Sequence, residues 1–174
     1  MCFGFCVSDA LVLRHQGCIL QDVAIGVRVC DCVPVLLAMP NSGDVAAMHV
    51  GWRGLLAGVI ENTVHTVRAV EHNHRVLAAI GPCIRSCCFV VHRDIAMRIG
   101  WKYVSENVNS STEFVHVDLC AAVCARLKAL GVTEIDVLHD CCTFHSPTHF
   151  HSYRRDGPHM GTMLASIAPK TQDL

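Results

Sequence analysis

Apolar residues occur along this chain in short runs and at helical spacings, which predicts strands interleaved with helices. Residues 22–29 alternate loosely and run into the apolar stretch 33–37, as expected of a buried strand. Further strands are predicted at 45–49, at 76–80, where the run stops at Gly81-Pro82, and at 133–138.

The same pattern predicts three helices. A helix is expected over residues 55–70, where apolar side chains recur at helical spacing: Leu55, Val59, Ile60, Val64 and Val67. A second helix should begin after the N-cap Asp118 and stop at Gly131, and residues 90–99 resemble a short third helix. Alternating strands and helices favour one α/β (mixed α+β) domain, followed after Cys142 by a polar, loop-like segment.

Composition narrows the class of protein. Hydrophobic residues make up 52% of the chain and the mean hydropathy is +0.38, yet no apolar run approaches the roughly 18 residues of a membrane span. A net charge of −1 gives no field that would attract nucleic acid. Residues 1–10 lack a basic segment before their apolar stretch, so we expect no secretory signal and a cytoplasmic protein without membrane or nucleic-acid partners.

The chain contains twelve cysteines, a number that could indicate disulfides. Their spacings suit a disulfide framework poorly, however, and no Cys-x-x-Cys pair occurs. In a reducing cytoplasm most should be small buried hydrophobic residues. We expect inert cysteines at Cys30, Cys87, Cys88, Cys120, Cys124 and Cys141, and structural ones at Cys83 and Cys142. The stretch with His145, His149 and His151 could hold a second metal, although a solvated loop is favoured.

The strongest chemical signal is the pair Cys32 and His49, which close two adjacent apolar runs beside a Gly-Trp-Arg-Gly turn. A thiolate and an imidazole at one sheet end suit zinc or copper, or a Cys–His catalytic couple. Arg53 follows His49 by one helical turn and could reach the same pocket as an anion holder. Arg154 and Arg155 carry planar guanidinium groups that suit phosphate oxygens, so we predict that they bind substrate.

Four stretches, in this order, together resemble the laccase-domain family: residues 31–36, 49–58, 80–84, and 142–143 with 152–157. This family is also called the polyphenol oxidase or multicopper-oxidase-like purine nucleoside phosphorylase family. The resemblance covers nearly the whole chain and implies a mixed sheet flanked by helices. It further implies a cytoplasmic enzyme that phosphorolyses adenosine, inosine and methylthioadenosine and deaminates adenosine, with earlier descriptions as a copper-dependent phenol oxidase. The family's zinc ligands are two histidines and one cysteine, and Cys32 and His49 match two of them.

The match also has departures. The family's other histidine lies in a Gln-Val-His segment well before the cysteine, and residues 1–31 contain none; His15 does not match it. We therefore expect residues 1–174 to form an N-terminally truncated domain whose two-ligand site binds zinc weakly. Thr162 stands where the family has arginine. Two alternatives stay open: a Cys–His hydrolase with Cys32 as nucleophile and His49 as base, and a non-catalytic domain that binds a nucleoside or a partner.

Overall fold

A five-stranded sheet forms the centre of the computed structural model, which describes residues 9–14, 23–69, 75–105 and 113–169. The strand order is β1 (Ala10–Leu13), β4 (Val45–Val50), β3 (Val33–Ala38), β5 (Leu77–Ile80) and β8 (Glu134–Val137). Every neighbouring pair is antiparallel except β5 and β8, which are parallel. The predicted α/β class and mixed sheet are confirmed.

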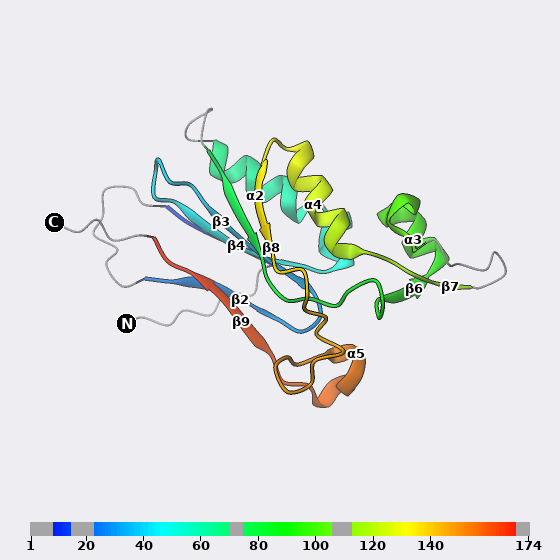
Figure 1. The fold of residues 1–174 in the computed structure, drawn as a ribbon. Helices are drawn as coiled ribbons and strands as arrows, with labels where there is room; N and C mark the ends of the chain where they lie inside the picture. Colours follow the sequence, from blue (N-terminus) through cyan, green and yellow to red (C-terminus); the bar gives the residue numbers. More distant parts are fainter. Residues whose placement is uncertain (1–8, 15–22, 70–74, 106–112, 170–174) are drawn as a thin grey trace.

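Two layers cover the sheet (Figure 1). Helices α2 (Val59–Arg68) and α4 (Leu119–Ala129) pack on one face, because the apolar stripe of each helix meets the alternate residues of β3 and β4 that point the same way. On the other face lies a two-stranded ribbon of β2 (Ile25–Val29) and β9 (Met163–Ile167), which forms a second small core with Leu36 and Ala47.

The predicted buried strand from residue 22 to residue 37 is wrong in one respect: it is two strands in different sheets. Between β2 and β3 the chain turns at Asp31, which has a positive φ of 76°. The predicted helix over 55–70 is likewise two helices, α1 (Trp52–Leu56) and α2, separated at Gly58, whose φ of 80° interrupts the helix. The predicted ends at Asp22 and Val70 lie outside the described residues, as does His15.

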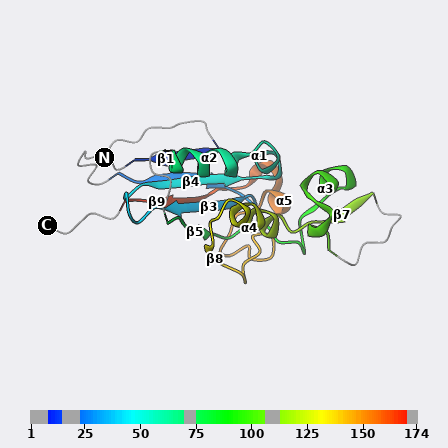
Figure 2. The same ribbon diagram turned by 90° about the horizontal axis from the view of Figure 1, so that it is seen from above.

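Residues 90–99 are only partly helical. The chain first forms β6 (Val90–His92), which pairs with β7 (Phe114–His116), and then α3 (Arg93–Ile99) and the 3-10 turn η1 (Trp101–Tyr103). Two views place α3 and β7 beyond one end of the five-stranded sheet (Figure 1, Figure 2). A strand of three residues carries too little alternation to be separated from the helix that follows.

Asp118 caps α4 as predicted, accepting a hydrogen bond of 2.8 Å from the backbone N–H of Ala121. The chain leaves that helix through Gly131, which has a φ of 75°. The segment predicted to be loop-like contains the short helix α5 (Tyr153–Asp156), the 3-10 turn η2 (Gly157–His159) and then β9. Among the described helices, none has both the length and the apolar character that crossing a bilayer requires.

Candidate functional site

At the end of the sheet where β4 leads into α1, neighbouring chain segments are linked across the sheet in the order Asp9, His49, Pro34 and Gly81. His49 of β4 lies opposite Pro34 of β3, and its backbone N–H donates to the carbonyl of Asp9 at 2.7 Å. On the other side, the N–H of Gly81 donates to the carbonyl of Pro34 at 3.2 Å. Because side chains alternate along a strand, His49 points to the same face as Ala47, toward the β2–β9 ribbon. Cys32 comes directly before β3, so the register brings it to this end of the sheet.

The imidazole of His49 has one nitrogen near a carboxylate and one nitrogen without a partner. Its Nδ1 lies 3.7 Å from Oδ1 of Asp9, whereas its Nε2 is buried and has no hydrogen-bond partner among the described residues. A buried polar atom left unpaired costs free energy unless it binds something. A carboxylate beside one imidazole nitrogen orients the other in many metal sites. The Nε2 atom is therefore suited to bind a metal or a substrate atom.

The thiol of Cys32 packs tightly against the turn that follows His49. A Cβ atom added to Gly51 would lie only 3.0 Å from the Cys32 Sγ. Burial, helped by the negative charges of Asp31 and then Asp9, raises the pKa of Cys32 to about 11. At neutral pH this thiol keeps its proton unless a cation replaces it, and metal ions do so when they bind cysteine. A cysteine sulfur and an imidazole nitrogen are both donors that zinc and copper accept.

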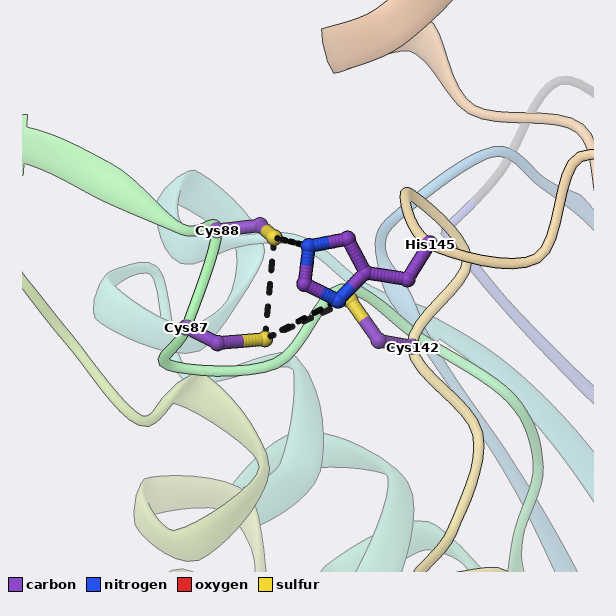
Figure 3. A group of neighbouring side chains, drawn as sticks. All are labelled: Cys87, Cys88, Cys142 and His145. Carbon is purple, nitrogen blue, oxygen red and sulfur yellow. Dashed lines mark hydrogen bonds between the residues drawn. The ribbon is translucent and has the colours of Figure 1, made fainter.

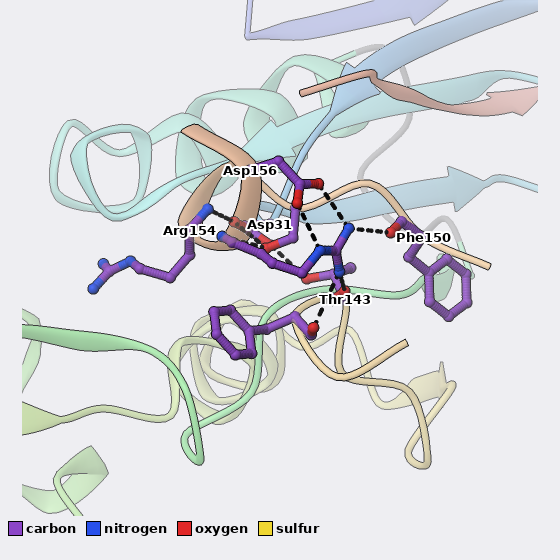
Figure 4. A network of polar contacts seen from close by, with 8 residues as sticks. Asp31, Thr143, Phe150, Arg154 and Asp156 are labelled. Atoms are coloured by element: carbon purple, nitrogen blue, oxygen red, sulfur yellow. Dashed lines mark hydrogen bonds and ion pairs between the residues drawn. The ribbon is translucent and has the colours of Figure 1, made fainter. Parts of the chain in front are cut away.

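A buried carboxylate holds the turn that carries Cys32 (Figure 4). Asp31 is 8% exposed and accepts three hydrogen bonds: from Thr143 Oγ1 at 2.6 Å, Ser152 Oγ at 3.1 Å and the backbone N–H of Arg154 at 2.7 Å. These donors come from a segment more than 110 residues away in sequence. We call Asp31, Thr143, Ser152 and the Arg154 amide the aspartate clasp. In the sequence, the one signal for this clasp is that its polar residues lie inside the stretches 31–36, 142–143 and 152–157, which resemble the family.

The two arginines of α5 have different surroundings. Arg155 uses all five N–H donors within the chain, on the carboxylate of Asp156 and on three backbone carbonyls: those of Thr143, Phe144 and Phe150. To bind a substrate anion, as predicted from the sequence, it would first have to release some of these groups. The side chain of Arg154 extends away from the clasp, and its Nη1 donates to the carbonyl of Val90 at 2.9 Å.

Arg53 lies on α1, with its guanidinium carbon 4.3 Å from the ring centroid of Trp52. Together with Arg98 it lines a cavity of about 330 Å³, whose remaining lining residues are Trp52, Leu56 and Ala57. Cys32 and His49 are not among these lining residues, and the expectation that Arg53 reaches their pocket stays a prediction. Two cations beside an aromatic face suit an anionic or aromatic group.

The chain is similar to known proteins in both sequence and structure. The sequence pattern of the family described as multi-copper polyphenol oxidoreductase laccase matches residues 6–170. A purine nucleoside phosphorylase of Deinococcus radiodurans is 36% identical over 165 residues, covering 94% of this chain and 62% of its own. The adenosine deaminase RL5, from an unknown prokaryotic organism, is 34% identical, covering 93% of this chain and 62% of its own.

Among solved structures, that of YlmD from Geobacillus stearothermophilus superposes with a TM-score of 0.78 at 28% identity. The alignment covers 94% of this chain and 61% of that one. The chain thus spans about three fifths of the length of these relatives. Since the family pattern extends over nearly all of its residues, the chain belongs to the multi-copper polyphenol oxidoreductase laccase family.

Proposed function

We propose that this chain processes purine nucleosides, by phosphorolysis to the free base and by deamination of adenosine, at a zinc site that includes Cys32 and His49. Adenosine, inosine and methylthioadenosine are the proposed nucleosides. Relatives named purine nucleoside phosphorylase and adenosine deaminase support this class of substrate. The observation that carries the proposal is the buried, unpartnered Nε2 of His49 at the sheet end that Cys32 adjoins.

Zinc with an open coordination position would supply a bound water with a pKa lowered to about 7. The residues of the chain prepare that position. Asp9 lies beside Nδ1 of His49 and favours the orientation in which Nε2 is the free nitrogen. The aspartate clasp fixes the turn before β3, which holds the backbone of Cys32 in place. Copper is the alternative metal for the same two ligands.

Phosphate needs cationic groups, and the site region offers two candidates. The guanidinium groups of Arg53 and Arg98 line one cavity beside Trp52. Among the described residues the side chain of Arg154 donates one hydrogen bond, to the carbonyl of Val90, which leaves further N–H groups for an anion. We assign the anion-binding role to these arginines and a structural role to Arg155.

The Cys–His hydrolase is a weaker hypothesis than the zinc-dependent nucleoside enzyme. A cysteine nucleophile acts as a thiolate and is favoured by a lowered pKa. Burial and Asp31 raise the pKa of Cys32 instead.

The test is a turnover assay on the purified chain with added zinc, phosphate and each nucleoside, with released base and ammonia measured by chromatography and a coupled assay. Cys32→Ser and His49→Ala should abolish turnover. Cys30→Ser is the matched control, because Cys30 shares the same turn and should leave turnover intact. Since the described residues provide two of the three ligands expected from the family, free imidazole is added in a parallel series as a substitute third ligand.

Turnover that needs zinc and disappears in both variants supports the proposal, whether or not imidazole is required. Turnover that survives Cys32→Ser would contradict it. Loss on alkylation of Cys32 together with full resistance to chelators would favour the hydrolase. Zinc binding without turnover of any nucleoside, with or without imidazole, would favour a binding domain.

A further inference from the structure

Three cysteines and a histidine from other parts of the chain form a second group of possible metal ligands (Figure 3). They are Cys87, Cys88, Cys142 and His145, and one donor atom from each lies within 4.8 Å of all the others. The Sγ of Cys87 is 3.7 Å from that of Cys142 and 3.6 Å from that of Cys88, and the Cys88 Sγ is 3.2 Å from the Nε2 of His145. We call these residues the Cys₃His cluster.

Three of the six donor–donor distances are close to those in the shell of one tetrahedral ion, and all six are within 4.8 Å. Zinc binds sulfur at about 2.3 Å and imidazole nitrogen at about 2.05 Å, so two ligand sulfurs lie about 3.8 Å apart and a sulfur and a nitrogen about 3.6 Å apart. The two measured sulfur–sulfur distances are 3.7 and 3.6 Å. The sulfur–nitrogen distance of 3.2 Å requires only a small outward shift of an exposed imidazole. A disulfide, by contrast, would require two sulfurs to approach to about 2.0 Å.

Backbone contacts bring the two halves of the cluster together without help from the thiols. Cys83 and Cys142 form a parallel β-bridge, and the N–H of Thr143 donates to the carbonyl of Cys83 at 3.2 Å. The guanidinium of Arg85 spans the same gap, with Nε donating to the carbonyl of Cys141 at 3.2 Å. The ligands are therefore held near one another before any ion binds, which lowers the entropic cost of binding.

The local turns present the donor atoms as metal-binding turns do. The N–H of His145 donates to the carbonyl of Cys142 at 3.2 Å, closing a tight Cys-x-x-His turn.

We propose that Cys87, Cys88, Cys142 and His145 bind one zinc ion as a closed, structural site, distinct from the site at Cys32 and His49. Four protein ligands leave no open position for a water or a substrate. The ion would replace the thiol protons, which pass to solvent, and no oxidant or reductant is required. Its effect would be to fasten the turn at 85–88 to the segment that carries Thr143 of the aspartate clasp.

Cobalt reports directly on such a site, because thiolate ligation gives a near-ultraviolet charge-transfer band and tetrahedral geometry gives intense visible bands. The full chain is reduced, stripped with a chelator and titrated with Co²⁺ and then Zn²⁺. In Cys32→Ser/His49→Ala, which removes the other site, one equivalent of Co²⁺ should still bind with both spectral features, and Zn²⁺ should displace it. Adding Cys88→Ser or His145→Asn should remove that equivalent, whereas adding Cys30→Ser should not.

A second measurement needs no variant. Zn²⁺ should protect Cys87 and Cys88 of the unmodified chain from iodoacetamide, as read by peptide mass spectrometry, and a chelator should restore labelling. The proposal is overturned if Cys32→Ser/His49→Ala shows no thiolate band, if Cys88→Ser leaves the band unchanged, or if the freshly reduced chain forms a Cys87–Cys142 disulfide under metal-free and zinc-loaded conditions alike. None of these results depends on whether the chain turns over nucleosides.

Discussion

Replacing Asp31 by alanine should destabilise the protein severely, because this one side chain satisfies three donors and occupies a left-handed backbone position. Each hydrogen bond to a charged acceptor contributes about 1.5–3 kcal/mol. The hydroxyls of Thr143 and Ser152 can turn toward other acceptors, so we count one of them and the Arg154 amide at about 1.5 kcal/mol each. The φ of 76° adds about 1 kcal/mol for alanine. The expected total loss is about 4 kcal/mol.

Urea unfolding of a graded series separates these contributions. Asp31→Asn keeps an acceptor oxygen and tolerates positive φ, so it should lose about half as much as Asp31→Ala. Asp31→Gly should exceed Asp31→Ala in stability by the backbone contribution of about 1 kcal/mol. Asp136→Ala, at an exposed position of β8, is the control and should change the free energy of unfolding by less than about 0.5 kcal/mol. A loss below about 1 kcal/mol for Asp31→Ala would refute the clasp as the element that holds this turn.

Three further results are expected. In Gly51→Ala the backbone φ of −82° suits alanine, but the added methyl group crowds the Cys32 Sγ. Calorimetry should therefore show zinc affinity at the Cys32–His49 site reduced about tenfold, and no such reduction in the control Gly54→Ala. Equal affinities of the two variants would contradict the packing. The pKa of Cys32 is about 11 in the folded protein against an ordinary 9.0, so the thiol should contribute about 3 kcal/mol to the free energy of unfolding of the metal-free protein. This contribution should be complete below pH 9 and lost as the pH rises through 11. Subtracting the pH profile of Cys32→Ser isolates it, and parallel profiles of the two proteins would refute the shift. Arg155→Lys should speed proteolysis of residues 143–157 far more than Arg154→Lys, and equal cleavage rates would argue against the carbonyl contacts of Arg155.

The sheet and the long helices were predictable because their apolar spacing is strong and local. The break between α1 and α2 was not, since Leu55, Val59 and Ile60 all contact the core and keep the helical period across Gly58. The turn at Asp31 was hidden in the same way, between two runs that each resemble a strand. Periodicity reports which face is buried, and it is insensitive to a single residue with positive φ.

For the candidate site, the sequence indicated Cys32 and His49 from their place at the ends of two runs. It did not indicate Asp9, whose role depends on strand pairing with His49. The Cys₃His cluster was missed because its two halves lie about 55 residues apart and lack a Cys-x-x-Cys pair. His145 had been grouped with His149 and His151, its neighbours in sequence, whereas the fold places it against Cys87 and Cys88.

The position of β8 at the border of the five-stranded sheet has a consequence for self-association. On one side its backbone polar groups have no partner strand in the part of the chain that the structure describes, and such borders can recruit strands from other molecules. Ile135 and Val137 pack inward, while the acidic side chains Glu134 and Asp136 project outward. Glu134 is held in an ion pair with Arg75. Asp136 adds a negative charge to this edge, and a charged side chain on a border strand opposes docking of a second copy strand against strand.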